Sequence, residues 1–336
     1  MQNKKIVFTA PWQAEFQEET LQTTGLEAGH ARVIKRYTLI SPGTELACLS
    51  GGESWFPMPD VPGYAAVSEI VELGEQTDGF QIGDLVFHYG KHCQYELVPV
   101  SGVFLKVPAD LEPRLVPFTR MATVAMTSVR VSNIELGDTV AVTGLGLIGN
   151  MASQLARLQG ANVIGIDLSE ERLKLASACG LALGVSAGSS DVAAEVREAT
   201  GGAGVSALIE ATGVPKVAVD SLPMIARFGE LIFLGSPRGE YTANVTDVFN
   251  YSHLIGRGSI TFKGAHEWRF PLEPDKFTKH SLVRNSAIVF DLIRDKKVHI
   301  EPLISHILKP EEASQAYEGL RHHKDDYNGV LFDWSE

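Results

Sequence analysis

One stretch of the chain, from Val140 to Asp167, constrains the fold more than any other part. It reads VAVTGLGLIGNMASQLARLQGANVIGID. An apolar, β-branched run meets three glycines in the pattern GxGxxG, a helical pattern of small residues follows, and a second apolar run ends in an acid. A strand, a glycine turn, a helix and a strand closed by a carboxylate are typical of a dinucleotide-binding unit.

Each residue of the glycine turn has a predicted task. Gly144 allows the tight turn, Gly146 lets the backbone approach a pyrophosphate, and Gly149 lets the helix pack closely on the strand. The following helix begins near Leu147 and Ile148, where backbone N–H groups are left over for phosphate oxygens. The turn is therefore assigned to the cofactor.

Asp167 distinguishes the two nicotinamide dinucleotides. A carboxylate at this position accepts hydrogen bonds from the adenosine ribose and repels a 2′-phosphate. The next two residues supply no cation, so the sequence favours NAD over NADP. Arg172, one helical turn further on, could reach the ribose edge or could pair with Glu170 or Glu171 on the surface.

Composition excludes several classes of partner. The chain has 336 residues, enough for two domains, and 29 Lys and Arg residues against 41 Asp and Glu give a net charge of −12. Without a basic cluster, nucleic acid and anionic membranes are poor candidates. Three widely spaced cysteines without a CxxC pair indicate a reducing compartment. No segment is apolar enough for a signal peptide or a membrane span, so we expect a cytoplasmic protein.

The rest of the chain falls into two kinds of pattern. The first hundred residues read as short strands and turns, which predicts a compact, irregular β-domain. After Asp167, strands alternate with helices, which predicts a parallel sheet with right-handed crossovers. Thr212 and Gly235 follow two of these strands and are assigned to the cofactor site. The expected strands are 32–39, 64–73, 85–88, 95–99, 207–210, 230–234, 259–263, 304–307 and 329–333, and the expected helices are 115–131, 170–179, 191–200, 216–225, 287–295 and 311–320.

Several short motifs, taken in order, resemble the medium-chain dehydrogenase/reductase family. They are Ser41-Pro42-Gly43-Thr44-Glu45, Pro62-Gly63-Tyr64, Leu136-Gly137-Asp138, the glycine fingerprint and Glu210-Ala211-Thr212-Gly213. The resemblance implies an α/β fold in which both chain ends, residues 1–121 and 267–336, form a GroES-like β-domain. Residues 122–266 would form an inserted Rossmann domain with a doubly wound parallel sheet. It also implies a homo-oligomer, a dimer or a tetramer, joined near residues 231–234 and 259–262.

The sequence departs from the family at the positions of the catalytic zinc. Zinc-dependent members use a Cys in the first turn, the His of a Gly-His-Glu, and a later Cys, Asp or Glu. Here the corresponding residues are Pro42, Tyr64 and Arg120, and none of them is an ordinary zinc ligand. Only Cys93 lies in the region of the structural zinc lobe. We therefore expect a member without zinc.

Without zinc, other residues must manage the proton and the oxyanion. Arg120 could offer positive charge to an alkoxide, and Tyr64 a hydrogen bond or a proton path. Alternatively, Arg120 pairs with Glu45 and Tyr64 only fills space. Thr44 matches the family position that begins a proton relay, or it is a turn residue satisfying its own backbone. Glu45 is expected to orient its neighbours.

Further candidates are aromatic or titratable residues. His88 and His92 could each act as general base, and His92 is preferred because it lies in a polar loop. His266 and Trp268, after the last Rossmann strand, could touch nicotinamide or substrate, or could simply pack. Trp55 lies in a loop that could shape a substrate pocket or pack on itself.

These observations predict a zinc-independent, NAD-dependent dehydrogenase that oxidises a secondary alcohol of a sugar, polyol or cyclitol, or runs the reverse reaction. One alternative is a quinone or enoyl reductase. Another alternative is a dehydrogenase of the bacteriochlorophyllide type. The C-terminal residues Leu331-Phe332-Asp333-Trp334 resemble that branch of the family. A third alternative is a non-catalytic NAD-binding sensor or structural protein.

Overall fold

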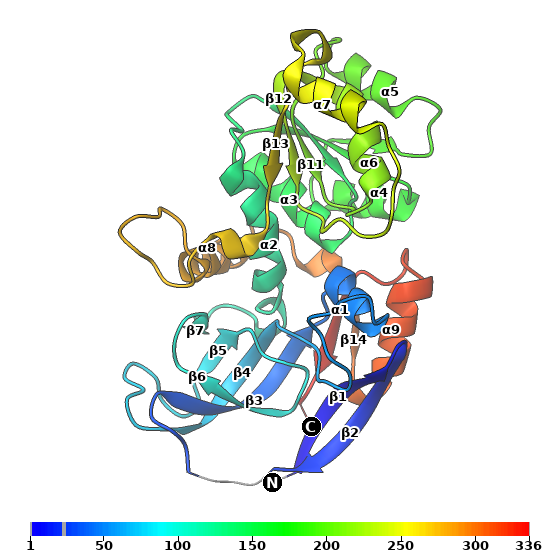
Figure 1. Cartoon of the computed structure of the whole chain (residues 1–336). Helices are drawn as coiled ribbons and strands as arrows, with labels where there is room; N and C mark the ends of the chain where they lie inside the picture. The colour runs from blue at the N-terminus through cyan, green and yellow to red at the C-terminus, as the bar shows by residue number, and fades with distance from the viewer. Residues whose placement is uncertain (1, 22–24, 336) are drawn as a thin grey trace. The chain divides into compact units, whose positions relative to one another are not determined.

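The computed structural model describes residues 2–21 and 25–335. The chain divides into two compact units, and each is described by itself. The first unit contains Met1–Arg120, Phe270–Lys296 and Leu303–Glu336, and the second contains Met121–Arg269 and Lys297–Pro302. Figure 1 shows the blue N-terminal and red C-terminal segments together in the first unit.

An antiparallel sheet built from both chain ends forms the centre of the first unit. Its strand order is β14-β15-β3-β4-β5-β7, and β6 also pairs with β3. The last strand pairs with β3 through Leu331 opposite Leu39, which ties the C-terminus to the first third of the chain. The strands are β3 (His30–Leu39), β4 (Ala66–Leu73), β5 (Leu85–His88), β6 (Tyr95–Pro99), β7 (Phe104–Lys106), β14 (Ile304–Leu308) and β15 (Gly329–Asp333).

A hairpin of β1 (Gln2–Ala10) and β2 (Gln13–Thr20) precedes this sheet and is not among the predicted strands. The second strand reads QAEFQEET and is mostly exposed or half-buried, so it lacks the alternating apolar residues by which a strand is recognised. Cross-strand pairing with the more apolar β1, including the Lys5–Glu19 ion pair at 2.5 Å, holds it in place.

Helix α1 (Pro42–Leu49) begins where the sequence indicates only a turn. Proline has a backbone φ close to the helical value and lacks the N–H that the first helical turn leaves unused, so Pro42 starts the helix rather than breaking it. The Glu45 carboxylate accepts a hydrogen bond from the Ser41 N–H at 2.8 Å, which stabilises this start. The segment that carries the first-turn motif is therefore a rigid helical end.

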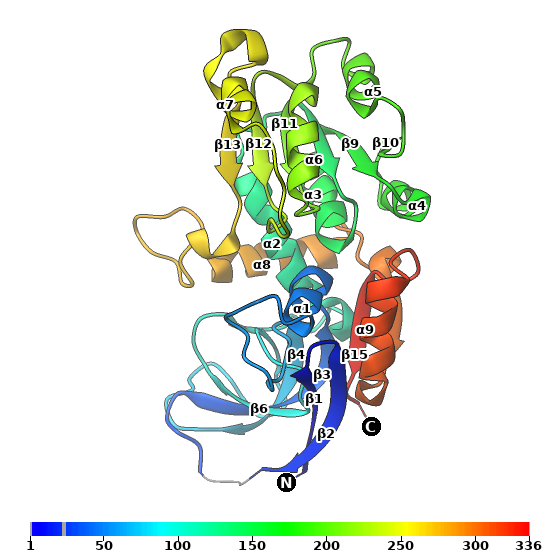
Figure 2. The ribbon, with the colours of Figure 1, turned by 45° about the vertical axis from the view of Figure 1, so that its right-hand side comes forward.

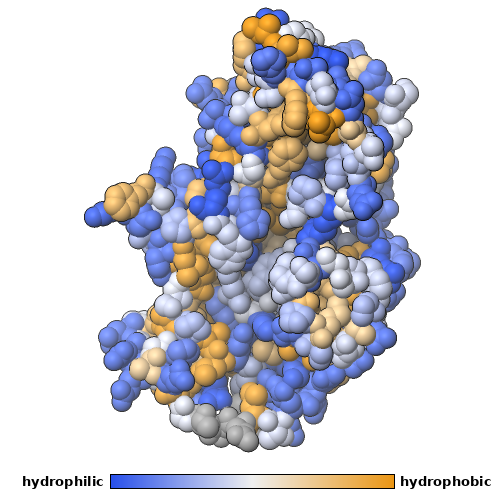
Figure 3. Space-filling view, viewed as in Figure 1, coloured by the Kyte–Doolittle hydropathy of each residue, from blue (hydrophilic) through white to orange (hydrophobic). Residues whose placement is uncertain are grey.

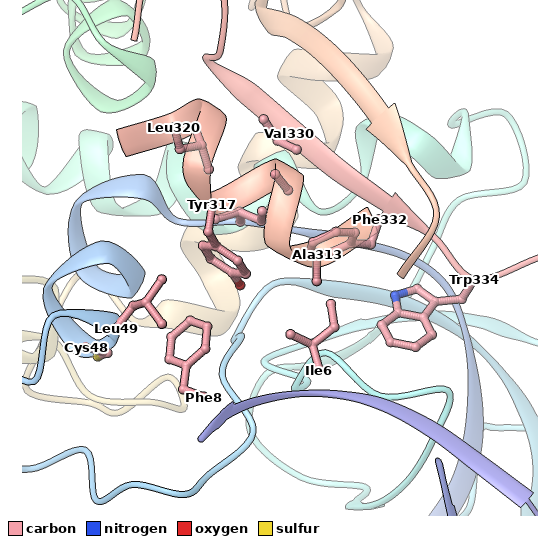
Figure 4. Packing of buried hydrophobic residues seen from close by; sticks show 12 residues of the cluster. Ile6, Phe8, Cys48, Leu49, Ala313, Tyr317, Leu320, Val330, Phe332 and Trp334 are labelled. Carbon is pink, nitrogen blue, oxygen red and sulfur yellow. The ribbon is translucent and has the colours of Figure 1, made fainter. Parts of the chain in front are cut away.

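A buried apolar cluster joins α1, the hairpin, α9 (Ala313–His322) and the last strand (Figure 4). Figure 4 shows Tyr317 and Trp334 reaching into this cluster from the C-terminal part of the chain. The Phe8 ring meets the Tyr317 ring edge-on, with centroids 5.0 Å apart. Burial of such large aromatic side chains stabilises the unit by roughly 1.5–3 kcal/mol each.

The second unit contains a parallel sheet in the order β10-β9-β8-β11-β12-β13. This order places β8 beside β11 at its centre, where successive crossovers turn in opposite directions, and ligands bind outside the strand ends at such a switch point. The strands are β8 (Thr139–Thr143), β9 (Asn162–Asp167), β10 (Leu183–Ser186), β11 (Val205–Glu210), β12 (Ile225–Phe233) and β13 (Thr261–Gly264). The predicted doubly wound α/β fold is confirmed.

Helices accompany these strands, as Figure 2 shows. They are α2 (Phe118–Val131), α3 (Leu147–Leu158), α4 (Glu170–Ala178), α5 (Val192–Ala199), α6 (Pro215–Asp220) and α7 (Val245–His253), while α8 (Leu282–Arg294) belongs to the first unit. The helix expected over 216–225 is shorter, because Pro223 cannot donate a helical hydrogen bond and Ile225 already belongs to β12. Helix α8 starts earlier than expected, at its N-cap Ser281, whose hydroxyl accepts from the Arg284 N–H at 3.1 Å.

Strand β13 lies at one end of the parallel sheet, so residues 259–262 reach its edge, whereas residues 231–234 lie mainly in β12 beside it. A cavity of about 190 Å³ lies between α6, α7 and these strands, and its wall includes Val214, Phe233, Val248 and Phe262. Figure 3 shows apolar residues gathered on this side of the unit. Within residues 2–21 and 25–335, no helix is long and apolar enough to cross a membrane.

Candidate functional site

Tyr64 and Arg120, which the sequence predicts together, are in contact in the first unit. The guanidinium carbon of Arg120 lies 4.9 Å from the Tyr64 ring centroid and 4.3 Å from that of Tyr89. Arg120 is only 6 % exposed. A guanidinium between two aromatic faces is held by its attraction to both rings, more strongly because water is excluded. A permanent positive charge is thus fixed beside a half-buried phenol.

The Tyr64 hydroxyl donates a hydrogen bond to Ser41 Oγ at the start of α1. Burial raises the pKa of Tyr64 above 10.0, although the Arg120 charge and hydrogen bonds with Ser41 and Thr44 oppose the change. The Glu45 charge adds to the increase. Tyr64 therefore keeps its proton at neutral pH, and its phenolate, when formed, is stabilised by the arginine and the two hydroxyls.

Thr44 lies in the first turn of α1 and is half-buried beside Tyr64. The predicted residues Thr44, Tyr64 and Arg120 therefore come together. They do so because β3 ends at Leu39, Pro42 starts the helix, and the segment before β4 brings Tyr64 back onto the helix start.

Glu45 is 2 % exposed and serves as an acceptor for three groups. Its Oε1 accepts from the Ser41 N–H at 2.8 Å, and its Oε2 accepts from the Tyr317 hydroxyl at 2.6 Å. His92 Nε2 also lies 3.0 Å from Oε2. The orienting role of Glu45 stays a prediction, and these three contacts are the ones through which it would act.

His92 is completely buried, although it lies in a polar loop. Its Nδ1 lies 2.7 Å from Thr38 Oγ1, so both ring nitrogens are engaged, one with Thr38 and one with Glu45. The Trp334 indole N–H donates to the same Thr38 oxygen at 2.9 Å. In this arrangement His92 has no nitrogen left to accept a substrate proton. The prediction that His92 is the preferred general base is therefore corrected.

The remaining candidates of the first unit lie elsewhere. His88 is buried, with Nε2 2.8 Å from Ser68 Oγ, and burial holds its pKa well below 6.5, with the nearby Lys35 charge adding to the effect. Trp55 is 61 % exposed and its indole N–H donates to Glu53 at 2.8 Å. Neither residue joins Tyr64 and Arg120.

His266 and Trp268 belong to the second unit. His266 is exposed, and Trp268, in the short 3-10 turn Glu267–Arg269, is 57 % exposed. Both side chains are too exposed to solvent to be packed core residues.

Five residues of this region were not predicted as site residues: Thr38, Ser41, Tyr89, Tyr317 and Trp334. Ser41 had a usable signal, since Ser before Pro is a common helix start. Tyr317 lies 272 residues from Glu45 in the sequence, and no local pattern connects them.

The glycine fingerprint has the geometry that a pyrophosphate requires. An added Cβ at Gly149 would lie 1.7 Å from the Gly144 carbonyl oxygen, so only glycine fits between helix and strand. At Gly146 an added Cβ would meet only the Arg172 side chain, at 3.9 Å, so the backbone is open to a ligand. Helix α3 begins at Leu147, followed by Ile148, and these residues would face the phosphates.

Asp167 lies at the end of β9, 7 % exposed, and orders the turn. Its Oδ2 accepts from the Leu145 N–H at 2.6 Å, and its Oδ1 accepts from the Ser169 N–H at 2.9 Å. Arg172 Nη1 lies 3.8 Å from Asp167 Oδ2. This contact brings the Arg172 side chain beside the acid at the end of β9.

Two later turns adjoin the fingerprint. An added Cβ at Gly144 would lie 2.7 Å from Thr212 Cγ2, and one at Gly235 would lie 2.3 Å from the Gly213 nitrogen. Buried Glu210 accepts from the N–H groups of Thr212 and Gly213 at 2.7 and 3.1 Å, and burial raises its pKa. Thr212 and Gly235 therefore lie beside the turn with which the sequence grouped them, and together these residues fit a dinucleotide.

Comparisons with known proteins agree with this architecture. Residues 148–273 match the family model of the zinc-binding dehydrogenases. The chain is similar to L-threonine 3-dehydrogenase of Shewanella woodyi, with 25 % identity over 304 residues, covering 80 % of this chain and 82 % of the relative. It is also similar to D-guloside 3-dehydrogenase of Shigella flexneri, with 27 % identity, covering 69 % of this chain and 73 % of the relative. Galactitol-1-phosphate dehydrogenase of Escherichia coli superposes with a TM-score of 0.83 at 18 % identity, covering 98 % of this chain and 99 % of that structure.

The segment 148–273 belongs to the zinc-binding dehydrogenase family, and the chain as a whole shares the fold of these dehydrogenases.

The residues at the three expected ligand positions do not fit a catalytic zinc. Pro42 offers no donor atom, Arg120 is a cation, and the Tyr64 hydroxyl is engaged with Ser41. Across the part of the chain that the structure describes, no group of three or more His, Cys, Asp or Glu side chains could hold a metal ion. The matched segment 148–273 contains none of Pro42, Tyr64 and Arg120.

Proposed function

We propose that this enzyme is a zinc-independent, NAD-dependent dehydrogenase that oxidises a secondary alcohol of a sugar, polyol or cyclitol to a ketone, or catalyses the reverse reaction. One observation carries the proposal: the Tyr64 hydroxyl donates a hydrogen bond to Ser41, and the buried Arg120 guanidinium lies against the Tyr64 ring. The similarity to a guloside dehydrogenase supports a polyhydroxy substrate.

In this proposal Tyr64 Oη handles the proton of the alcohol. In the oxidative direction its phenolate accepts the hydroxyl proton, and in the reductive direction the phenol returns it to the alkoxide. Arg120 stabilises the phenolate and the developing alkoxide, because its charge is close and poorly screened. Thr44 and Ser41 hold the phenol oxygen through hydrogen bonds.

The cofactor would be held by Gly144, Gly146, Leu147, Asp167 and Arg172, and its nicotinamide supplies the hydride acceptor or donor. The Asp167 carboxylate repels a 2′-phosphate, which supports NAD. The opposing feature is Arg172, whose guanidinium lies near both Gly146 and Asp167. A comparison of kcat/KM for NAD and for NADP tests which of the two cofactors the enzyme prefers.

The decisive experiment follows NADH formation from NAD with myo-inositol, galactitol, sorbitol and methyl α-D-glucopyranoside, with EDTA present throughout. Turnover of at least one substrate under chelation is the expected result. Activity that EDTA abolishes and zinc restores would overturn the metal-free proposal. Turnover restricted to substrates with one hydroxyl group would overturn the polyhydroxy substrate class.

We also propose that the enzyme is a homo-oligomer associating through the β13 edge of the parallel sheet, because an unpaired strand edge exposes backbone donors and acceptors. Light scattering of the purified protein measures its mass, and a monomeric mass at micromolar concentration would contradict this.

A further inference from the structure

Glu45 connects the candidate acid/base residue with the C-terminal part of the chain. Ser41 is hydrogen-bonded at both of its ends, since its N–H donates to Glu45 and its Oγ accepts from Tyr64. A displacement of the Glu45 carboxylate therefore displaces Ser41, and with it the partner of the Tyr64 hydroxyl. The geometry of Tyr64 depends on what holds Glu45.

Tyr317 and His92 hold Glu45 from two other directions. The Tyr317 hydroxyl donates to Oε2 at 2.6 Å, and the pKa of Tyr317 is raised well above 10.0 by burial and by the Glu45 charge, so this donor stays protonated. His92 Nε2 lies 3.0 Å from the same oxygen. A carboxylate has no hydrogen to give, so the hydrogen between His92 and Glu45 must be on Nε2.

Trp334 continues this line on the far side of His92. An indole N–H only donates, so Thr38 Oγ1 is the acceptor in the 2.9 Å contact with Trp334. His92 Nδ1 lies 2.7 Å from that oxygen. Thr38, His92 and Glu45 are each 2 % exposed or less, so water does not compete for these hydrogen bonds.

We infer that Glu45, His92 and Tyr317 are positioning residues, which aim the Tyr64 hydroxyl through Ser41, and that Thr38 and Trp334 anchor His92. This inference rests on the proposed function, because that proposal gives Tyr64 its role. The hydrogen bonds themselves are independent of the proposed function.

The C-terminal members are placed by packing that is independent of the hydrogen bonds. Tyr317 lies on α9, and its ring centroid is 5.0 Å from that of Phe8 and 6.4 Å from that of Phe332 (Figure 4). Trp334 is 4 % exposed and follows β15. The apolar cluster thus fixes the Tyr317 hydroxyl and the Trp334 N–H in place. Burying these polar groups would cost free energy without their hydrogen bonds to Glu45 and Thr38.

The hydrogen position is tested by nitrogen NMR of protein labelled with ¹⁵N-histidine, with the His92 signals assigned by their loss in His92→Gln. The expected result is a slowly exchanging proton on His92 Nε2. An unprotonated Nε2 would overturn the inference, because Glu45 would then be the donor. This readout needs no substrate.

The positioning role is tested with Tyr317→Phe, which removes one hydroxyl and keeps the ring. We expect kcat to fall roughly ten-fold, because small displacements of a reacting group cost rate, with the KM for NAD unchanged. Tyr327→Phe is the matched control: this ring stacks on His306 in the same unit, outside the positioning set. It is expected to keep both kcat and the His92 signals.

A double-mutant comparison separates this inference from the proposed function. In a Tyr64→Phe background, Tyr317→Phe is expected to have no further effect on kcat, because its influence passes through Tyr64. If Tyr64→Phe alone left activity intact, the proposed function would fail. If Tyr64→Phe lost activity but Tyr317→Phe behaved like Tyr327→Phe, the positioning inference alone would fail.

Discussion

The guanidinium carbon of Arg120 lies 4.9 Å from the Tyr64 ring centroid, so a buried, permanent cation borders a half-buried phenol. In zinc-dependent relatives a metal ion would stabilise the alkoxide. In the proposed mechanism Arg120 supplies the charge and Tyr64 transfers the proton, whereas a catalytic zinc ion both stabilises the alkoxide and promotes loss of the hydroxyl proton. The arginine cannot lose its charge, so pH acts through the tyrosine.

Arg120→Met should move the pH profile of alcohol oxidation. Oxidation needs the Tyr64 phenolate, so kcat/KM rises as pH approaches the Tyr64 pKa, which is already above 10.0. Without the guanidinium that pKa rises further, and the rising limb should move upward by roughly one pH unit or more. Arg120→Lys, which keeps the charge, is the control. Parallel profiles that differ only in height would contradict the electrostatic role.

The sequence predicted the second unit better than the first, for a physical reason. A glycine turn between two apolar strands is a local device, and the structure has this turn from Gly144 to Gly149, with Asp167 at the end of the second strand. The strands of a parallel sheet are also apolar throughout, so they are easy to recognise. The end of α6 was displaced by one proline, and strand β10 and helix α7 were not predicted.

The site in the first unit depends on contacts between distant residues. Tyr64, Thr44 and Arg120 were found because a family pattern marks their positions. Tyr317 and Trp334 were not found, since an aromatic residue in an apolar helix or strand is normally read as core, and here it is core and hydrogen-bond donor at once. The loop position of His92 suggested exposure, whereas the backbone turns it inward.

Asp167→Asn should change the cofactor preference. The amide keeps an oxygen for the Leu145 N–H but removes the charge that repels a 2′-phosphate, and Arg172 remains beside it. The ratio of kcat/KM for NADP to that for NAD should rise about ten-fold, equivalent to about 1.4 kcal/mol. In the same background Arg172→Gln should reverse part of the gain. An unchanged ratio would show that Asp167 only orders the turn.

A fully buried lysine should make the first unit sensitive to one substitution. The Lys35 side chain has no exposed surface, and its Nζ lies 2.6 Å from Glu96 Oε2. Glu96→Gln leaves the ammonium without its partner, and we expect a loss of about 3 kcal/mol in the free energy of unfolding. Lys35→Met combined with Glu96→Gln should recover much of this loss. Urea denaturation of the three proteins measures it, and a double variant less stable than Glu96→Gln would contradict the explanation.

His88 should make stability fall in mildly acidic solution. Burial and the Lys35 charge hold its folded-state pKa well below 6.5, so the unfolded chain binds a proton there that the folded chain does not. The free energy of unfolding then decreases as pH falls below about 6.5, by up to about 1.4 kcal/mol per pH unit, until the folded-state pKa is reached. His88→Gln removes this proton and keeps a polar group for Ser68, so its stability should decline less between about pH 6.5 and 5. His323→Gln, which changes an exposed histidine at the end of α9, should decline like the wild type. Denaturation curves across this interval measure the difference, and equal slopes for wild type and His88→Gln would show that His88 is protonated in the folded protein.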